Sequence, residues 1–292
     1  MNVRPEDEEM GKGKVVSNFS WRNVQMNVKV GSQQKQILDG ISGSLKGGEV
    51  CALMGPSGAG KTSLLNVLAG RVRTRGTTRV DGSILLDNQS ISGSALRKRI
   101  AYVMQQDILT PTQTVRESLW FSANLRLPSS YTKQQKHELV EKTLKDLGLE
   151  KCADTYIGDD MIRGVSGGEK KRTCVGIELI MKPKLIFLDE PTSGLDSYAA
   201  HNVVMRLKDM AAHDGCNVLC TIHQPSSEVF HLFNRTMILR SGKLFYFGSL
   251  EGLSGSLHAA GKGCPNVSWP YCSAVLSQGL VFTFREGDFC DF

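Results

Sequence analysis

Residues 55 to 62 read GPSGAGKT and combine glycines, a lysine and a threonine in a spacing suited to phosphate binding. Glycines at positions 55, 58 and 60 let the backbone pass close to a phosphate group, and Lys61 brings a cation to the phosphate oxygens. The hydroxyl group of Thr62 is a suitable ligand for Mg²⁺. A glycine-rich turn before a helix is the simpler alternative. The motif therefore predicts a phosphate-binding loop if a strand precedes it and a helix follows it.

A second glycine motif, GVSGGEKKRT, lies at residues 164 to 173. Ser166 and the two glycines after it would expose backbone N–H groups at the start of a helix, which is a common way to bind phosphate. A serine N-cap followed by two flexible glycines is the alternative interpretation. The adjacent basic residues Lys170 to Arg172 are interpreted as a solvated helix face or as neighbours of phosphate. The chain thus contains two candidate phosphate sites.

Polar residues also stand at the ends of apolar runs. Asp189 follows LIFL and is suited to hold Mg²⁺, while the adjacent Glu190 is placed to act as a general base on an attacking water. His223 ends the run NVLCTIH, although a lone histidine there is more often structural than catalytic. Gln105, in YVMQQD, is able to hydrogen-bond a metal-bound water. Two acidic residues at a strand end could instead be solvated or cap a helix, and a single glutamine is nearly uninformative alone, so these residues gain weight only beside the two phosphate motifs.

Apolar strands are predicted around these residues. FSWRNVQMNVKV, at 19 to 30, partly alternates as a strand does, and EVCALMG reads as a buried strand that stops at the phosphate motif. The segment KTSLLNVLAG has a leucine face and Gly70 at the C′ position, which predicts a helix. KLIFLDE and NVLCTIH are continuous apolar runs, typical of parallel strands whose carboxyl ends form a site.

Turn and helix signals describe the remaining segments. Asp81-Gly82 and Ser241-Gly242 each lie between apolar runs and predict two-residue hairpins. Between about 109 and 182 the pattern becomes helical, with capping boxes formed by Thr114 with Glu117 and by Thr132 with Gln135. A helical insertion is therefore expected to interrupt the α/β core.

Composition narrows the class of protein. The 292 residues carry 35 basic and 29 acidic side chains, a formal net charge of +6, but the basic residues are too scattered to favour nucleic acid as a partner. The eight cysteines form no CxxC pair and several lie in apolar runs, as expected for buried thiols in a reducing compartment. No stretch approaches the roughly 18 apolar residues that a membrane span requires. We therefore expect a soluble, cytoplasmic chain.

Five segments together resemble the nucleotide-binding domain of ATP-binding-cassette (ABC) proteins: GPSGAGKT, YVMQQD, VSGGEKKR, LIFLDEPTSGLD and TIHQPS. The resemblance runs from about residue 19 to 266. It implies an α/β P-loop NTPase with a mixed β core, an antiparallel β sub-domain and an inserted α-helical sub-domain at about 105 to 182. ATP and Mg²⁺ are the implied ligands. The implied domain spans 17–266, between a polar tail at 1–16 and an atypical tail at 267–292.

In that family two domains pack head to tail, and the VSGGE signature of one closes over the γ-phosphate of the ATP held by the other. A second nucleotide-binding domain, identical or different, is thus the implied partner. The resemblance implies Glu190, His223 and Gln105 as catalytic residues, and Thr62, Gln105 and Asp189 as metal ligands. The nucleotide-binding residues that it implies are Gly55, Pro56, Ser57, Gly58, Ala59, Gly60, Lys61, Thr62, Ser63, Ser166, Gly167, Gly168, Glu169 and Asp196, the last in a D-loop that begins at Ser193.

Three longer segments are similar to the white-type half-transporters of subfamily G: GVSGGEKKRTCVGIELI, DEPTSGLDSYAA and TIHQPSSEVFHLFNR. In that subfamily a nucleotide-binding domain on the cytoplasmic side of a membrane precedes a six-helix membrane domain. Its members export sterols, other lipids, pigment precursors and xenobiotics. The resemblance therefore implies an Mg-dependent ATPase that energises export when it is joined to membrane domains.

Two departures from the family pattern stand out. Many ABC ATPases stack adenine on an aromatic residue before the phosphate loop; the nearest candidates here are Phe19 and Trp21, and Met26 takes the expected place.

After AGKGCPN the chain continues as VSWPYCSAVLSQG rather than into a linker and membrane helices, which predicts a truncated or alternative end. A truncated ATP-binding fragment that pairs with and modulates intact half-transporters is thus the alternative function.

Overall fold

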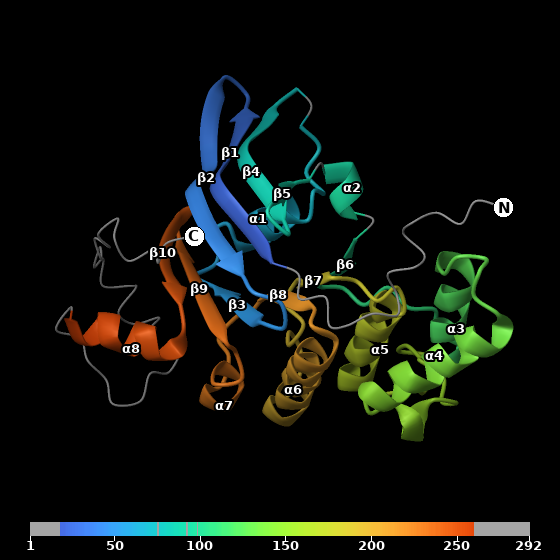
Figure 1. Cartoon of the computed structure of the whole chain (residues 1–292). Helices are drawn as coiled ribbons and strands as arrows, with labels where there is room; N and C mark the ends of the chain where they lie inside the picture. The colour runs from blue at the N-terminus through green and yellow to red at the C-terminus, as the bar shows by residue number, and fades with distance from the viewer. Residues whose placement is uncertain (1–17, 75, 92, 98, 260–292) are drawn as a thin grey trace.

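A computed structural model describes residues 18–74, 76–91, 93–97 and 99–259 of the chain (Figure 1). The predicted tails at 1–16 and 267–292 lie outside the described residues. The described part has two β-sheets with helices between and below them. None of its helices is long and apolar enough to span a membrane.

The central sheet has six strands in the order β10-β9-β3-β8-β7-β6, and all of its pairs are parallel except β10 with β9. Every residue of β3, β7 and β8 is buried, which explains why these segments are continuous apolar runs rather than alternating ones. The predicted Ser241-Gly242 hairpin joins β9 to β10, with φ angles of 48° and 76°. The six strands are β3 (Val50–Met54), β6 (Ile100–Val103), β7 (Leu185–Leu188), β8 (Asn217–Thr221), β9 (Arg235–Arg240) and β10 (Lys243–Gly248).

The second sheet is antiparallel, in the order β2-β1-β4-β5. It lies over the central sheet, and α1 (Lys61–Leu68) packs with both sheets in one apolar core. Phe19 and Trp21 are fully buried in that core, so neither aromatic side chain is available to stack on a base. The strands are β1 (Phe19–Val30), β2 (Gln33–Leu45), β4 (Thr78–Leu86) and β5 (Gln89–Ser90).

The predicted hairpin at Asp81-Gly82 is wrong. Both residues lie inside the single strand β4, which pairs with β1 on either side of a register shift between Arg22 and Gln25. Gly82 has a φ of 114°, and a Cβ at this position would lie 2.7 Å from the carbonyl oxygen of Asn23. The glycine therefore permits a bulge where β1 approaches closely, rather than a chain reversal.

Helices cover the other face of the central sheet. Figure 1 shows α3, α4 and α5 grouped at one end of the molecule, and α6 and α7 below the sheet. Both predicted capping boxes are present, at the N-terminal ends of α3 and α4. The helices after α1 are α2 (Gly93–Arg97), α3 (Val115–Arg126), α4 (Lys133–Asp146), η3 (Glu150–Cys152), α5 (Gly167–Leu179), α6 (Ser197–Asp214), α7 (Ser227–Phe230) and α8 (Leu250–Ala259).

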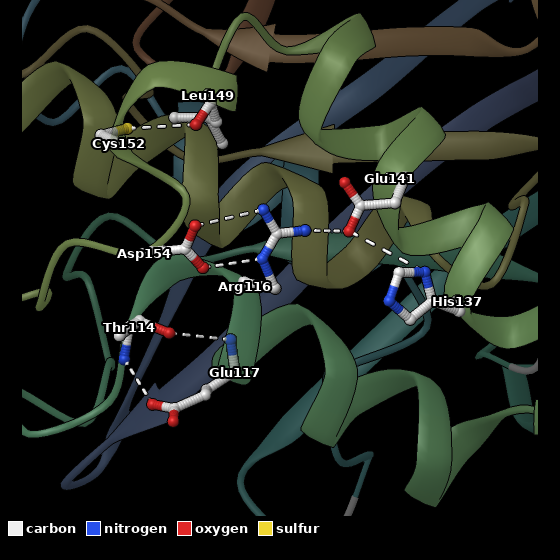
Figure 2. Close-up of polar contacts among 8 residues, drawn as sticks. All are labelled: Thr114, Arg116, Glu117, His137, Glu141, Leu149, Cys152 and Asp154. Atoms are coloured by element: carbon white, nitrogen blue, oxygen red, sulfur yellow. Dashed lines mark hydrogen bonds and ion pairs between the residues drawn. The ribbon is translucent and has the colours of Figure 1, made fainter.

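Polar contacts join the helices α3 and α4 to the loop after η3. The Arg116 guanidinium of α3 forms ion pairs with Glu141 of α4 and with Asp154, and its Nε lies 2.8 Å from the Asp154 carboxylate (Figure 2). The hydrogen bond from Arg116 lowers the pKa of Asp154 below its usual value. Residues 155 to 166 lead from this loop into α5, so the cluster lies on the segment of chain that approaches the second glycine motif.

Candidate functional site

The first glycine motif connects β3 to α1, as the sequence predicts. Gly55 has a φ of 147°, and a Cβ there would lie 2.2 Å from the carbonyl oxygen of Leu239 in β9. Gly58 and Gly60 also have positive φ angles, 75° and 99°. Only glycine adopts this succession of backbone conformations without strain. The loop therefore wraps tightly at the carboxyl end of β3, directly before the helix N-terminus.

Lys61 begins α1 and turns its ammonium group back toward the loop. Its Nζ donates hydrogen bonds to the carbonyl oxygens of Gly55 at 2.9 Å and Pro56 at 3.1 Å. The residue is only 7% exposed. Burial lowers the pKa of Lys61, and the nearby carboxylates of Glu190 and Asp189 oppose that effect. A cation is thus held inside a cradle of backbone groups.

A chain of hydrogen bonds joins α1 to the carboxyl ends of β7 and β8. Thr62 Oγ1 donates to Asp189 Oδ1 at 3.2 Å, and Thr221 Oγ1 donates to the same oxygen at 2.7 Å. The Thr221 hydroxyl in turn accepts from the backbone N–H of Glu190 at 2.8 Å. The parallel register of β7 and β8 places these residues side by side. The structure therefore brings together the predicted Thr62, Asp189 and Glu190.

Gln105 extends this chain of hydrogen bonds to the carboxyl end of a further strand, β6. Its Nε2 donates to Glu190 Oε2 at 2.8 Å, across 85 residues of sequence. Gln105 follows β6, which pairs with β7 in parallel, so both side chains emerge at the same sheet edge. Glu190 has a φ of 49°, an uncommon conformation for a non-glycine residue that turns the chain sharply after the strand.

His223 follows β8 and shares a surface cavity with Glu190. The cavity has a volume of about 290 Å³ and is lined mainly by residues 192–195, by Ser197 and by residues 223–226, which follow β7 and β8. Ser193 lies in its wall, and Asp196 caps α6 by accepting from the Ala199 N–H at 2.9 Å. The cavity thus brings Glu190, Ser193 and His223 around one hollow that is open to solvent.

The oxygen atoms at this site suit Mg²⁺, provided that a phosphate group supplies the remaining ligands of the metal. The Thr62 hydroxyl and the buried Asp189 carboxylate meet at the mouth of the loop, and hydroxyl and carboxylate oxygens are the hard ligands that Mg²⁺ prefers. Among the described residues no group of three or more His, Cys, Asp or Glu could hold a metal alone. The set of ligands therefore fits a metal bound with a phosphate substrate rather than a protein-only cage.

The second glycine motif lies at the start of α5 and makes its own local contacts. Ser166 is the N-cap of α5, and its N–H and hydroxyl both donate to Glu169 Oε2 at 2.8 Å. Burial alone would raise the pKa of Glu169, but these hydrogen bonds outweigh it and lower the pKa. The nearest atom to a Cβ built on Gly167 belongs to Leu195, and on Gly168 to Ala199. Within one chain the motif thus packs toward the start of α6 rather than against loop 55–62.

Two residues that sequence reasoning missed organise the site. Thr221 supplies the hydroxyl that joins Asp189 to the Glu190 backbone, although a threonine inside an apolar strand gives only a β-propensity signal. Lys171 belongs to a basic cluster that is interpreted from the sequence as a solvated helix face or as neighbours of phosphate; for Lys171 the solvated face is wrong, because its side chain is 3% exposed and ion-paired with Asp107. Its neighbour in the sequence, Lys170, donates to the carbonyl of Gly158.

Comparison with known proteins agrees with this geometry. Residues 38–193 match the family model described as ABC transporter. The chain is 45% identical to ABC transporter G family member 22 of Arabidopsis thaliana over 84% of this chain and 33% of that protein. It is 42% identical to ABC transporter G family member STR of Medicago truncatula over 90% of this chain and 32% of that protein. The chain therefore spans about a third of the length of the curated relatives it matches.

The solved structures agree on the fold. The dimeric ATP-binding cassette MJ0796, bound to ADP and Pi after hydrolysis, superposes with a TM-score of 0.65 and 24% identity, covering 80% of this chain and 98% of that one. At this identity the likeness shows the fold. Together with the family match and the G family relatives, it identifies the described fold as that of an ABC ATPase. The chain belongs to the ABC transporter family and carries the nucleotide-binding domain of its subfamily G.

Proposed function

We propose that the chain binds ATP with Mg²⁺ and hydrolyses it, and that this reaction energises export across a membrane when the domain is joined to membrane domains. The observation that carries the proposal is the chain of hydrogen bonds from Thr62 through Asp189, Thr221 and Glu190 to Gln105. It unites four segments that are distant in sequence at one sheet edge, beside the phosphate loop.

In the proposed site the backbone of residues 55 to 63 and the Lys61 ammonium bind the phosphates. Thr62 and Asp189 would hold Mg²⁺, with Gln105 contributing directly or through water. The metal, when bound, would neutralise charge on the phosphate oxygens. The lysine is already buried among the loop carbonyls and so loses little further hydration when phosphate arrives.

Glu190 is proposed as the general base that orients and deprotonates the attacking water. The Gln105 amide and the hydrogen bond from Glu190 N–H to Thr221 fix this side chain from two directions. His223, in the wall of the same cavity, is proposed to hydrogen-bond the γ-phosphate or the water. In this proposal water is the nucleophile, and Glu190 and His223 would support its in-line attack on a phosphoryl group.

The second glycine motif is proposed to serve a partner domain. Ser166 is exposed at a helix N-terminus, and the motif packs toward the start of α6 rather than against residues 55–62, so a phosphate bound at Ser166 to Glu169 would come from another chain. The proposed partner is a second nucleotide-binding domain, and each nucleotide would lie between residues 55–63 of one chain and 166–169 of the other. Asp196, beside the shared cavity, would face the same interface. The proposed location is the cytoplasmic side of a membrane, and lipids, sterols, pigments and other small molecules are the proposed cargo.

The test is ATP hydrolysis by the purified chain over a series of protein concentrations, with Glu190→Gln alongside. Specific activity should rise with concentration if two chains form the site, and Glu190→Gln should lower turnover roughly 10²- to 10⁴-fold while ATP binding is retained. Hydrolysis that is independent of concentration would contradict the paired site. Undiminished turnover by Glu190→Gln would contradict the role of the base.

A further inference from the structure

Lys171 is a buried cation that does not touch the phosphate loop. Its ammonium group lies 2.6 Å from Asp107 Oδ1 and donates to the carbonyl oxygen of Gln105 at 2.9 Å. The Lys171 side chain is 3% exposed, whereas that of Asp107 is 26% exposed. A lysine is rarely buried to this degree unless a carboxylate pairs with it, so the contact is built into the fold rather than left at the surface.

The contact joins two parts of the proposed site. Gln105 lies in the loop after β6 and reaches Glu190 with its side chain, while Lys171 lies on α5, whose first turn begins at the N-cap Ser166. The backbone of Gln105 is therefore attached to α5 and its side chain to the proposed base. Cys174, one turn further along α5, also faces Asp107; burial and this carboxylate raise the pKa of Cys174 to about 12.

A second set of contacts fixes the same two regions to each other. Backbone hydrogen bonds run from Arg116 N–H to the Ala153 carbonyl at 2.8 Å and from Gly158 N–H to the Pro111 carbonyl at 2.9 Å. Residues 111–116 continue from the Gln105 loop, and residues 153–158 lead toward Ser166. The loop and the start of α5 are thus attached both through Lys171 and through the backbone.

We infer that Lys171 is a positioning residue for ATP hydrolysis, which ties the Gln105 loop to α5 so that Gln105 stays in contact with Glu190. The inference rests on the proposed ATPase function. Ser166 and Gln105 then move as one body. A shift of the second glycine motif, which would bind the partner's nucleotide, would therefore also shift the glutamine beside the chain's own nucleotide. Lys171 acts through Gln105 and touches neither nucleotide nor water itself.

Lys171→Met is the decisive variant, because it keeps the length and packing of the side chain and removes the ammonium group. The Asp107 carboxylate that remains is partly exposed and can be hydrated, so the protein should still fold. Lys170→Met is the matched control: it lies on the same helix, but its ammonium group donates to the Gly158 carbonyl. Asp107→Asn is a second variant, which weakens the same contact from the loop side while keeping an acceptor oxygen.

The first measurement is hydrogen–deuterium exchange of residues 104–110 in the full chain without nucleotide. Lys171→Met should raise exchange there about 10-fold and Asp107→Asn by less, whereas Lys170→Met should leave it at the wild-type level. The second measurement is steady-state hydrolysis, in which Lys171→Met should lower kcat about 10-fold and change the KM for ATP less than about twofold.

Unchanged exchange in a folded Lys171→Met protein would overturn the attachment, and so would an equal rise in Lys170→Met. Faster exchange with a wild-type kcat would show that the attachment exists but positions nothing for catalysis, which also overturns the inference. If the wild-type chain hydrolyses no ATP at any concentration, the proposed function fails; the exchange result then still decides whether Lys171 holds the loop.

Discussion

Thr221 and Asp189 are joined by a hydrogen bond of 2.7 Å between the Thr221 hydroxyl and Asp189 Oδ1, at the ends of two neighbouring parallel strands. Both residues are buried. The same threonine oxygen accepts from the N–H of Glu190 at 2.8 Å. One side chain outside the predicted site therefore orients the proposed metal ligand and fixes the backbone of the proposed base.

Thr221→Val should impair this arrangement without changing the shape of the strand. Valine replaces the hydroxyl by a methyl group and leaves one oxygen of Asp189 and the Glu190 N–H without this partner, a loss of about 1–3 kcal/mol for each buried polar group. We expect kcat to fall about 10-fold or more, and Mg²⁺-dependent ATP binding to weaken. Thr221→Ser, which keeps the hydroxyl, is the control. Wild-type activity in Thr221→Val would show that the hydroxyl is not needed.

Gly55→Ala should be more damaging than Gly58→Ala. Both glycines have positive φ angles, which cost a non-glycine residue about 1–2 kcal/mol. A Cβ on Gly55 would in addition lie 2.2 Å from the Leu239 carbonyl oxygen, whereas a Cβ on Gly58 meets no atom within 4 Å. Thermal unfolding and ATP binding should both show the larger loss in Gly55→Ala. An equal effect of the two variants would contradict the close contact between the loop and β9.

Asp154→Asn should reveal a pH-dependent contribution to stability. The hydrogen bond from Arg116 lowers the pKa of the folded Asp154 carboxyl below the usual value for an aspartate. A depressed pKa contributes stability that is fully present above the unfolded value and is lost as the pH falls through the folded value. At pH 7 the variant should therefore have a slightly lower Tm than the wild type, because the pair is exposed, and the two should converge in acid once the pH falls below the folded pKa of Asp154. A difference in Tm that persists unchanged into acid would contradict the ion pair shown in Figure 2.

The sequence predicted the parts of the fold that depend on local chemistry. The loop at 55–62, the C′ glycine Gly70 and the two capping boxes each depend on residues close together in the chain, and the structure has all of them. The Ser241-Gly242 turn is also present, because both residues adopt the positive φ angles that such a turn needs.

The features that sequence reasoning missed depend on contacts between distant segments. Asp81-Gly82 has the local signal of a hairpin, but pairing of β4 with β1 on both sides of the glycine keeps the strand continuous. Lys171 reads as a surface residue because its partner Asp107 is 64 positions earlier in the sequence. Phe19 and Trp21 precede the phosphate loop in the sequence but point into the core between the two sheets. The roles assigned to Gln105, Glu190, His223 and Ser166 remain predictions.

The central claim is that each nucleotide is shared between residues 55–63 of one chain and Ser166 of another. The measurement that tests it most directly is sedimentation of Glu190→Gln with ATP and Mg²⁺, with and without the further substitution Ser166→Asp. Aspartate can still accept from the Glu169 N–H as an N-cap, but it no longer donates to the Glu169 carboxylate, and it places a negative charge where a partner's phosphate would lie. We expect an ATP-dependent dimer of Glu190→Gln and, for the double variant, a monomer that still binds ATP. A dimer that survives Ser166→Asp, or an ATP-loaded Glu190→Gln that stays monomeric at every concentration, would contradict it.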